Sequence, residues 1–133
     1  MKRVLFICVH NAGRSQIAEA FFNKMAKGKA VAVSAGTQPA AQVNPAVVAV
    51  MREAGVDMGQ QKPGALILEM AESADRVISM GCGVESVCPV SFVPTEDWEI
   101  PDPEGQPIAE VRRIRDRIKA KVEVLVKEMA LGR

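Results

Sequence analysis

Four consecutive apolar residues near the start of the chain, Val4–Ile7, constrain the fold more than any other feature. A short run that is apolar at every position is typical of a β-strand covered on both faces, and such strands belong to parallel sheets. From Ser15 to about Lys27, apolar residues recur at helical spacing, with Ser15 placed to cap the helix and Gly28 to end it. The chain is therefore predicted to begin with a strand, a tight loop and a helix.

This alternation continues along the sequence. The remaining elements are expected as a strand (Ala30–Ala35), a helix (Asn44 to about Ala54), a short helix (Pro63 to about Ala71), a strand (Arg76–Met80), a weaker strand (Val90–Val93), a long loop (Pro94–Pro107) and a long closing helix from Pro107. Alternating strands and helices favour an α/β fold with right-handed crossovers. We expect a single domain over residues 1–133, built on a four-stranded parallel sheet flanked by helices on both faces.

The charge balance excludes several classes of partner. The 17 basic and 16 acidic residues leave a net charge of +1, which supplies no field to gather nucleic acid or an anionic membrane surface. No stretch approaches the roughly 20 apolar residues of a membrane span, and the first apolar run is too short for a signal peptide. We expect a cytoplasmic monomer, in which three cysteines serve as reactive thiols rather than as a disulfide framework.

The octet Cys8-Val9-His10-Asn11-Ala12-Gly13-Arg14-Ser15 joins the first strand to the first helix. Consecutive backbone N–H groups before a helix N-terminus form an anion-binding concavity, here predicted from Val9, His10, Asn11, Ala12, Gly13, Arg14 and Ser15. Arg14 adds a planar donor fork for two oxygens, and the Ser15 hydroxyl can donate to a Cys8 thiolate. We expect Cys8 to attack a bound tetrahedral oxyanion and His10 to shape the loop. The alternative is that Cys8 is an inert core thiol.

Together with the following Gln16-Ile17-Ala18-Glu19-Ala20, this octet resembles the phosphate loop of the low-molecular-weight protein tyrosine phosphatase superfamily. At position 16 this chain has glutamine, as in the arsenate reductase branch that it resembles, whereas the phosphatases typically carry proline there. The resemblance extends to Asp102-Pro103, which is similar to the superfamily's acid loop and implies that Asp102 protonates the leaving oxygen. The phosphatases usually follow Asp-Pro with tyrosine, whereas this chain has Glu104 there and no tyrosine at all.

Two further cysteines, Cys82 and Cys88, follow the strand predicted over Arg76–Met80. Their spacing does not match a zinc knuckle, so they are either reactive or two unreactive small apolar residues. The chain resembles thioredoxin-coupled arsenate reductases here too, which implies a relay. In that relay Cys8 attacks arsenate, Cys82 attacks the Cys8 sulfur and releases arsenite, and Cys88 then attacks Cys82. Thioredoxin would reduce the final disulfide, and phosphate or sulfate would bind as analogues of arsenate.

Two alternative functions remain open. One is a phosphatase that hydrolyses phosphomonoesters through a Cys8 phosphoenzyme, and the other is a non-catalytic, anion-binding redox sensor. No tightly bound cofactor is expected. Some relatives hold a potassium ion through an Asn, a Ser, a Glu and an Asp, and the resemblance implies that site only in part. Asn11, Ser15 and Glu19 match it, but Gly64-Ala65 stands where the aspartate is expected.

Overall fold

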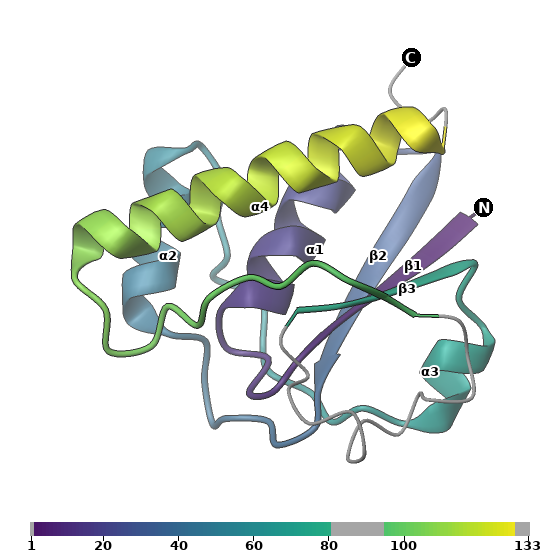
Figure 1. Cartoon of the computed structure of the whole chain (residues 1–133), viewed down its shortest axis with the longest axis horizontal. Helices are drawn as coiled ribbons and strands as arrows, with labels where there is room; N and C mark the ends of the chain where they lie inside the picture. Colours follow the sequence, from purple (N-terminus) through teal and green to yellow (C-terminus); the bar gives the residue numbers. More distant parts are fainter. Residues whose placement is uncertain (1, 81–94, 130–133) are drawn as a thin grey trace.

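The computed structural model describes residues 2–80 and 95–129. Within them, the strands β1 (Lys2–Cys8), β2 (Ala30–Gly36), β3 (Arg76–Ser79) and β4 (Glu96–Asp97) form a parallel sheet of order β2-β1-β3-β4 (Figure 1). The predicted four-stranded parallel sheet is confirmed. Its central position makes β1 the most enclosed strand, and Val4 to Ile7 have no exposed surface.

Helices cover both faces of the sheet, as predicted. On one face, α1 (Arg14–Met25), α2 (Pro45–Glu53) and α4 (Ile108–Glu128) share a buried cluster with Phe6 of β1. On the other face, α3 (Leu68–Glu72) packs against a smaller cluster and lies apart from the other helices (Figure 1). Successive β1 side chains alternate between the two clusters, because neighbouring residues of a strand point to opposite faces.

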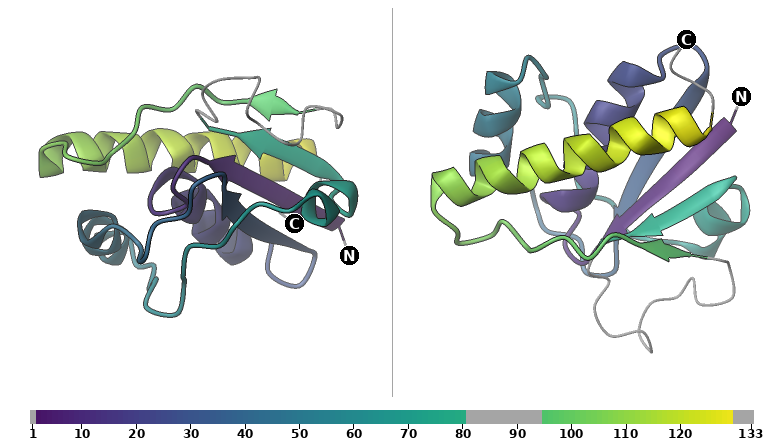
Figure 2. Two further views of the ribbon diagram at one scale, coloured as in Figure 1. Left: turned by 90° about the horizontal axis from the view of Figure 1, so that it is seen from below. Right: turned by 45° about the horizontal axis from the view of Figure 1, so that its top comes forward.

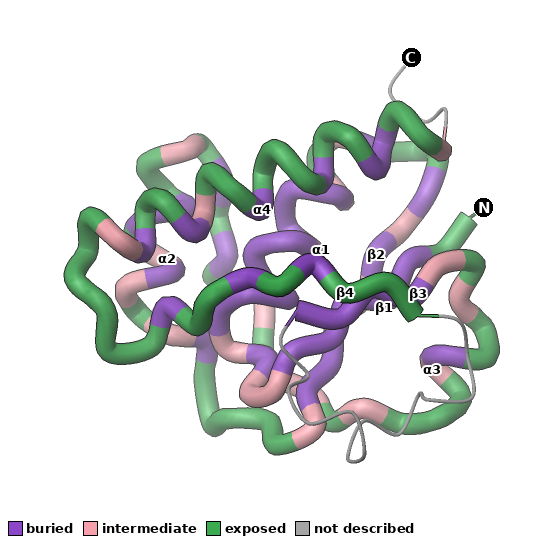
Figure 3. The backbone as a smooth tube through the Cα atoms, in the orientation of Figure 1, coloured by how far each residue is buried: buried purple, intermediate pink, exposed green. Residues whose placement is uncertain are grey.

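The closing helix α4 runs across α1 and α2, which both views of Figure 2 show. Its buried residues recur every three or four positions, as the sequence predicts, and they include Val111, Ile114, Ile118, Val122 and Leu125. Figure 3 shows the buried residues concentrated along the sheet and on the inner side of α1. Among the residues described, no helix combines the length and the apolar character that a membrane span requires.

Two expectations about helix ends are wrong. Gly13, not Ser15, precedes α1, and Ser15 lies inside the first turn, where its hydroxyl contacts Cys8. The helix expected over Pro63–Ala71 begins only at Leu68. Residues 64–66 are extended instead, because Gly36 N–H donates to the carbonyl of Gly64 (2.9 Å) and Leu66 N–H donates to the carbonyl of Gly36 (2.9 Å). This pairing lengthens the sheet edge beside β2.

The fourth strand among the described residues is β4, which the apolar pattern does not indicate. The predicted strand Val90–Val93 lies outside the described residues, and so do Cys82 and Cys88. The observed β4, Glu96–Asp97, falls in the segment predicted to be a loop. Pairing with β3 forms this strand, and Trp98 extends it by donating its backbone N–H to the Ser79 carbonyl (2.9 Å). The buried Trp98 ring packs beside Phe6 with a centroid separation of 5.6 Å.

Candidate functional site

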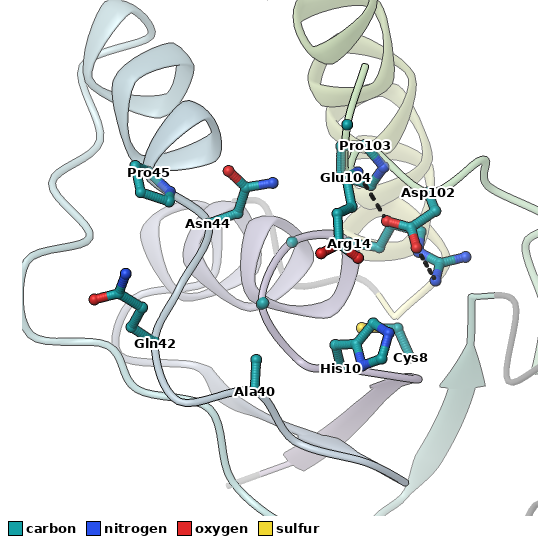
Figure 4. A pocket seen from close by; sticks show the side chains of 13 residues that line it. Cys8, His10, Arg14, Ala40, Gln42, Asn44, Pro45, Asp102, Pro103 and Glu104 are labelled. Atoms are coloured by element: carbon teal, nitrogen blue, oxygen red, sulfur yellow. Dashed lines mark hydrogen bonds and ion pairs between the residues drawn. The ribbon is translucent and has the colours of Figure 1, made fainter.

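The candidate site lies at the carboxyl end of β1, where open parallel sheets characteristically bind ligands. Cys8 is the last residue of β1, and only 2% of it is exposed. A cleft of about 520 Å³ opens beside it. Figure 4 shows Cys8, Arg14 and Asp102 on one side of this cleft, facing Gln42 and Asn44. The structure thus brings the predicted nucleophile, cation and acid to one cavity.

The backbone carbonyl groups of residues 8–12 attach the loop after Cys8 to the segment that follows β2. Four of them accept hydrogen bonds from the segment after β2: Thr37 N–H to Cys8 O (3.4 Å), Gln38 N–H to Val9 O (2.8 Å), Ala40 N–H to His10 O (2.9 Å) and Asn44 N–H to Ala12 O (2.8 Å). In a trans peptide the N–H points opposite to the carbonyl. The N–H groups that follow these carbonyls therefore point away from the segment after β2, and we expect an anion to bind to them.

Asn11 orients the hydroxyl group that contacts the Cys8 sulfur. It is fully buried and left-handed, with φ of 51°. Its Oδ1 accepts from the backbone N–H of Gly64 (2.8 Å), which can only donate. Its Nδ2 consequently donates to Ser15 Oγ (2.6 Å) and Ser34 Oγ (3.0 Å). Because the Ser15 oxygen accepts from Asn11, its proton is free to point at Cys8 Sγ, 2.9 Å away. A sulfur that receives this hydrogen bond is stabilised as the thiolate.

Gly36 allows the loop to pass close to the end of β2. A Cβ at this position would lie 2.6 Å from the Val9 carbonyl oxygen and 2.9 Å from the Asn11 nitrogen. Both distances are shorter than van der Waals contact, so the loop conformation requires glycine here. Sequence reasoning missed Gly36 and Ser34 as site residues. The available signal was their place at the carboxyl end of a predicted parallel strand.

Arg14 connects the phosphate loop to the acid loop. It is 7% exposed, and its Nη1 donates to the Ile100 carbonyl (3.0 Å). Its Nη2 lies 3.7 Å from Asp102 Oδ2, and 46% of the Asp102 side chain is exposed to the cleft and solvent. Asp102 Oδ1 accepts from the Glu104 backbone N–H (2.9 Å), which orients the carboxyl group. The next residue, Pro103, packs so closely that a Cβ on Gly13 would lie 2.8 Å from its Cγ.

His10 takes part in the loop's attachment. Its Nδ1 lies 3.1 Å from the Gln38 carbonyl, and its own carbonyl accepts from Ala40. The ring lines the cleft beside Cys8 (Figure 4). This placement agrees with a role in shaping the loop, which stays a prediction.

The residues expected around potassium are arranged differently from a cation site. Glu19 Oε1 accepts from Ser34 Oγ (2.7 Å), and Asn11 turns its amide nitrogen, not its oxygen, toward Ser34 and Ser15. Burial raises the pKa of Glu19 more than the Ser34 hydrogen bond lowers it. Potassium requires converging oxygen lone pairs, so these side chains as placed do not fit the ion. In the described ranges, no cluster of three His, Cys, Asp or Glu side chains could hold a metal.

Comparison with known proteins gives consistent matches. The low molecular weight phosphotyrosine protein phosphatase family matches residues 3–132. A glutaredoxin arsenate reductase from Synechocystis is 36% identical over 134 residues, covering 98% of this chain and 100% of that protein. A thioredoxin-dependent arsenate reductase from Corynebacterium glutamicum superposes with a TM-score of 0.84 at 36% identity. That alignment covers 100% of this chain, which spans 64% of the Corynebacterium protein. An arsenate reductase in its phosphate-binding state gives a TM-score of 0.85 at 37% identity, with 96% and 98% coverage.

Proposed function

Since the chain belongs to the low molecular weight phosphotyrosine protein phosphatase family, we propose that it acts within that family as an arsenate reductase. The single observation that carries this proposal is the Ser15 hydroxyl 2.9 Å from Cys8 Sγ, in a loop whose carbonyl groups are occupied by hydrogen bonds from the segment after β2. The arsenate reductase names of its full-length relatives at 36% to 37% identity support the choice of substrate.

The first step is attack on bound arsenate. The N–H groups of the loop and the Arg14 guanidinium hold the oxyanion and stabilise charge that develops on its oxygens. The Cys8 thiolate forms a sulfur–arsenic bond, one arsenic–oxygen bond breaks, and Asp102 delivers the proton that lets this oxygen leave as water. Arg14 lies within reach of both the anion site and Asp102, so a single guanidinium connects binding to proton delivery.

The second step is the two-electron transfer. The Cys82 thiolate attacks the Cys8 sulfur, the sulfur–arsenic bond breaks, and its electron pair stays on arsenic, which leaves as arsenite. Cys88 then attacks Cys82, which returns the Cys8 thiolate and leaves a Cys82–Cys88 disulfide. The sheet register supports this relay, because Ser79 at the end of β3 pairs with Ile7, the neighbour of Cys8, and Cys82 follows three residues later.

The external reductant is proposed to be thioredoxin. The names of the two relatives differ on this point, since one specifies glutaredoxin and the other thioredoxin. A chain with three cysteines needs no outside thiol for its first disulfide, which favours a dithiol donor that reduces a finished disulfide.

The test is steady-state turnover of arsenate with each reductant system offered separately. We expect thioredoxin, thioredoxin reductase and NADPH to sustain arsenite production. Cys82→Ser should abolish multiple turnover while it spares hydrolysis of p-nitrophenyl phosphate. If only glutaredoxin and glutathione sustain arsenite production, glutaredoxin would be the partner instead of thioredoxin. Failure of both systems to yield arsenite would reject the reductase assignment and favour a redox sensor.

Phosphomonoester hydrolysis is the second candidate, and one observation favours it. The cleft of about 520 Å³ continues from the loop to Gln42 and Glu104, which leaves room for the organic part of a phosphoester. Cys8 and Asp102 would serve the same roles through a phosphoenzyme. Ester hydrolysis without arsenite production would establish this function instead.

A further inference from the structure

Gln16 is a buried carboxamide to which the proposed chemistry assigns no role. It lies in the first turn of α1 and is 1% exposed. Three oxygen atoms surround its Nε2: the Asn11 carbonyl (3.0 Å), Asn11 Oδ1 (3.1 Å) and the Lys62 carbonyl (3.1 Å). On its other side, Oε1 accepts from Gln61 Nε2. One side chain thus connects the phosphate loop to the segment before Gly64.

The direction of these hydrogen bonds is fixed by backbone groups. The carbonyls of Asn11 and Lys62 can only accept, so Gln16 must present its NH₂ group to them. The same NH₂ group contacts Asn11 Oδ1 from one side, while Gly64 N–H contacts it from another. Both contacts keep the Asn11 amide nitrogen turned toward Ser15.

The consequence reaches the Cys8 sulfur. Asn11 has a positive φ, which is unfavourable for a residue with a side chain, so its conformation depends on the groups around it. Gln16 holds both the backbone carbonyl and the side-chain oxygen of that residue. If Asn11 turned, Ser15 would lose the donor that occupies its oxygen and helps to orient its proton toward Cys8.

We propose that Gln16 is a positioning residue for the Cys8 thiolate, acting through Asn11 and Ser15. This inference rests on the proposed function only in taking Cys8 as the nucleophile. Gln61 Nε2 donates to Gln16 Oε1, so Gln61 in turn holds the Gln16 side chain in place. Gln16 touches neither the anion nor the sulfur, and its effect is carried by the two intervening side chains.

The test uses the full chain with Cys82→Ser and Cys88→Ser, which leaves Cys8 as the one thiol. Gln16→Met removes the donor at nearly constant length, and Gln16→Glu places an acceptor against the two carbonyls. The exposed Gln60→Met is the matched control. Two quantities are measured: the rate of iodoacetamide alkylation as a function of pH, and the affinity for inorganic phosphate by calorimetry.

We expect both Gln16 variants to move the midpoint of the alkylation profile to higher pH and to weaken phosphate binding about fivefold, the loss that goes with one hydrogen bond. Gln60→Met should change neither. An unchanged midpoint in folded Gln16→Met protein would overturn the proposal. If that variant does not fold, Gln61→Met should shift the midpoint less but in the same direction, and no shift there would overturn it too.

The two proposals can fail separately. Arsenate turnover of the unsubstituted protein tests the reductase assignment without any change at Gln16. A chain that makes no arsenite but still shifts its alkylation profile in Gln16→Met would retain the positioning role and lose the reductase function. A chain that makes arsenite with an unshifted profile would show the reverse.

Discussion

Asp102 and Arg14 form the contact on which the proposed proton delivery depends. Their side chains approach to 3.7 Å, and Asp102 is also held by the Glu104 backbone N–H. This separation exceeds an ordinary hydrogen bond, and the Asp102 side chain is 46% exposed whereas Arg14 is buried. The pair can therefore rearrange when an anion takes up the Arg14 donors.

Asp102→Asn should slow the first turnover of arsenate by about 100-fold to 10,000-fold, because the amide cannot supply the proton. Phosphate affinity should hold or rise slightly, since a negative charge is removed from beside the anion site. Rapid-quench measurement of arsenite formation and phosphate calorimetry check the two parts, with the exposed Asp57→Asn as a control. A first-turnover rate equal to that of the unsubstituted protein would assign the acid elsewhere.

The ionisation of Glu19 makes the free energy of unfolding depend on pH. Burial raises its pKa above 4.5, so the folded chain keeps this proton to higher pH than the unfolded chain does. At low pH the protonated Glu19 favours folding. This contribution to stability is lost as the pH rises from the pKa of Glu19 in the unfolded chain through its higher pKa in the folded chain. At neutral pH the carboxylate therefore costs stability.

Glu19→Gln should accordingly increase the free energy of unfolding at pH 7.5, with a gain that disappears near pH 4. The amide oxygen can still accept from Ser34, so the hydrogen bond is preserved. Urea unfolding at the two pH values measures the difference. Destabilisation of Glu19→Gln at pH 7.5 would show that the charge itself is needed, as for a bound cation.

Among the structural elements, the junction of β2 with the loop after Cys8 has no room for a side chain at Gly36. Gly36→Ala would place a methyl group 2.6 Å from the Val9 oxygen and should cost about 1 to 3 kcal/mol of stability, with loss of phosphate binding. Gly64→Ala is the matched control, because a Cβ there meets no atom within 4 Å. Thermal unfolding and phosphate calorimetry of both variants check this. Equal behaviour of the two would contradict the close approach.

The elements that sequence predicts well are those that bury apolar residues in a regular pattern. The continuous apolar run Val4–Ile7 locates β1, which is buried at each of those positions, and apolar residues at every third or fourth position locate α4, of which one face is covered. The apolar pattern fails for β4, whose Glu96 and Asp97 are exposed and polar, because backbone pairing and side-chain hydrogen bonds with β3 hold this strand. The prediction that Ser15 caps α1 fails because its hydroxyl contacts the Cys8 sulfur rather than the backbone at the helix end.

The residues of the candidate site likewise divide into those that the sequence predicts and those that it does not. The octet indicates Cys8, Arg14 and Ser15 because they are contiguous in sequence and share one loop. Ser34, Gly36 and Gly64 reach that loop from other segments, and only tertiary structure brings them there. The sequence signal for Ser34 and Gly36 is their place at the carboxyl end of a predicted parallel strand, and that signal does not say which residues they contact.

At the scale of the whole molecule, the parallel sheet gathers the site from separate parts of the chain. The phosphate loop follows β1, the segment that binds its carbonyls follows β2, and the acid loop follows β4, so all three leave the same edge. Parallel strands place their carboxyl ends together, and chemistry at such an edge can draw on several loops. The fold thereby brings together the residues proposed as nucleophile, cation and acid, which are Cys8, Arg14 and Asp102.

A single turnover without external reductant shows directly whether Cys8 attacks the bound oxyanion. Fully reduced protein is mixed with arsenate under anaerobic conditions, and arsenite and remaining thiols are counted. Each chain should release one arsenite ion and lose two of its three thiols, whereas Cys8→Ser should do neither. Arsenite formation that persists in Cys8→Ser, or an unsubstituted chain that keeps all its thiols and yields none, would contradict attack by Cys8 on the bound oxyanion.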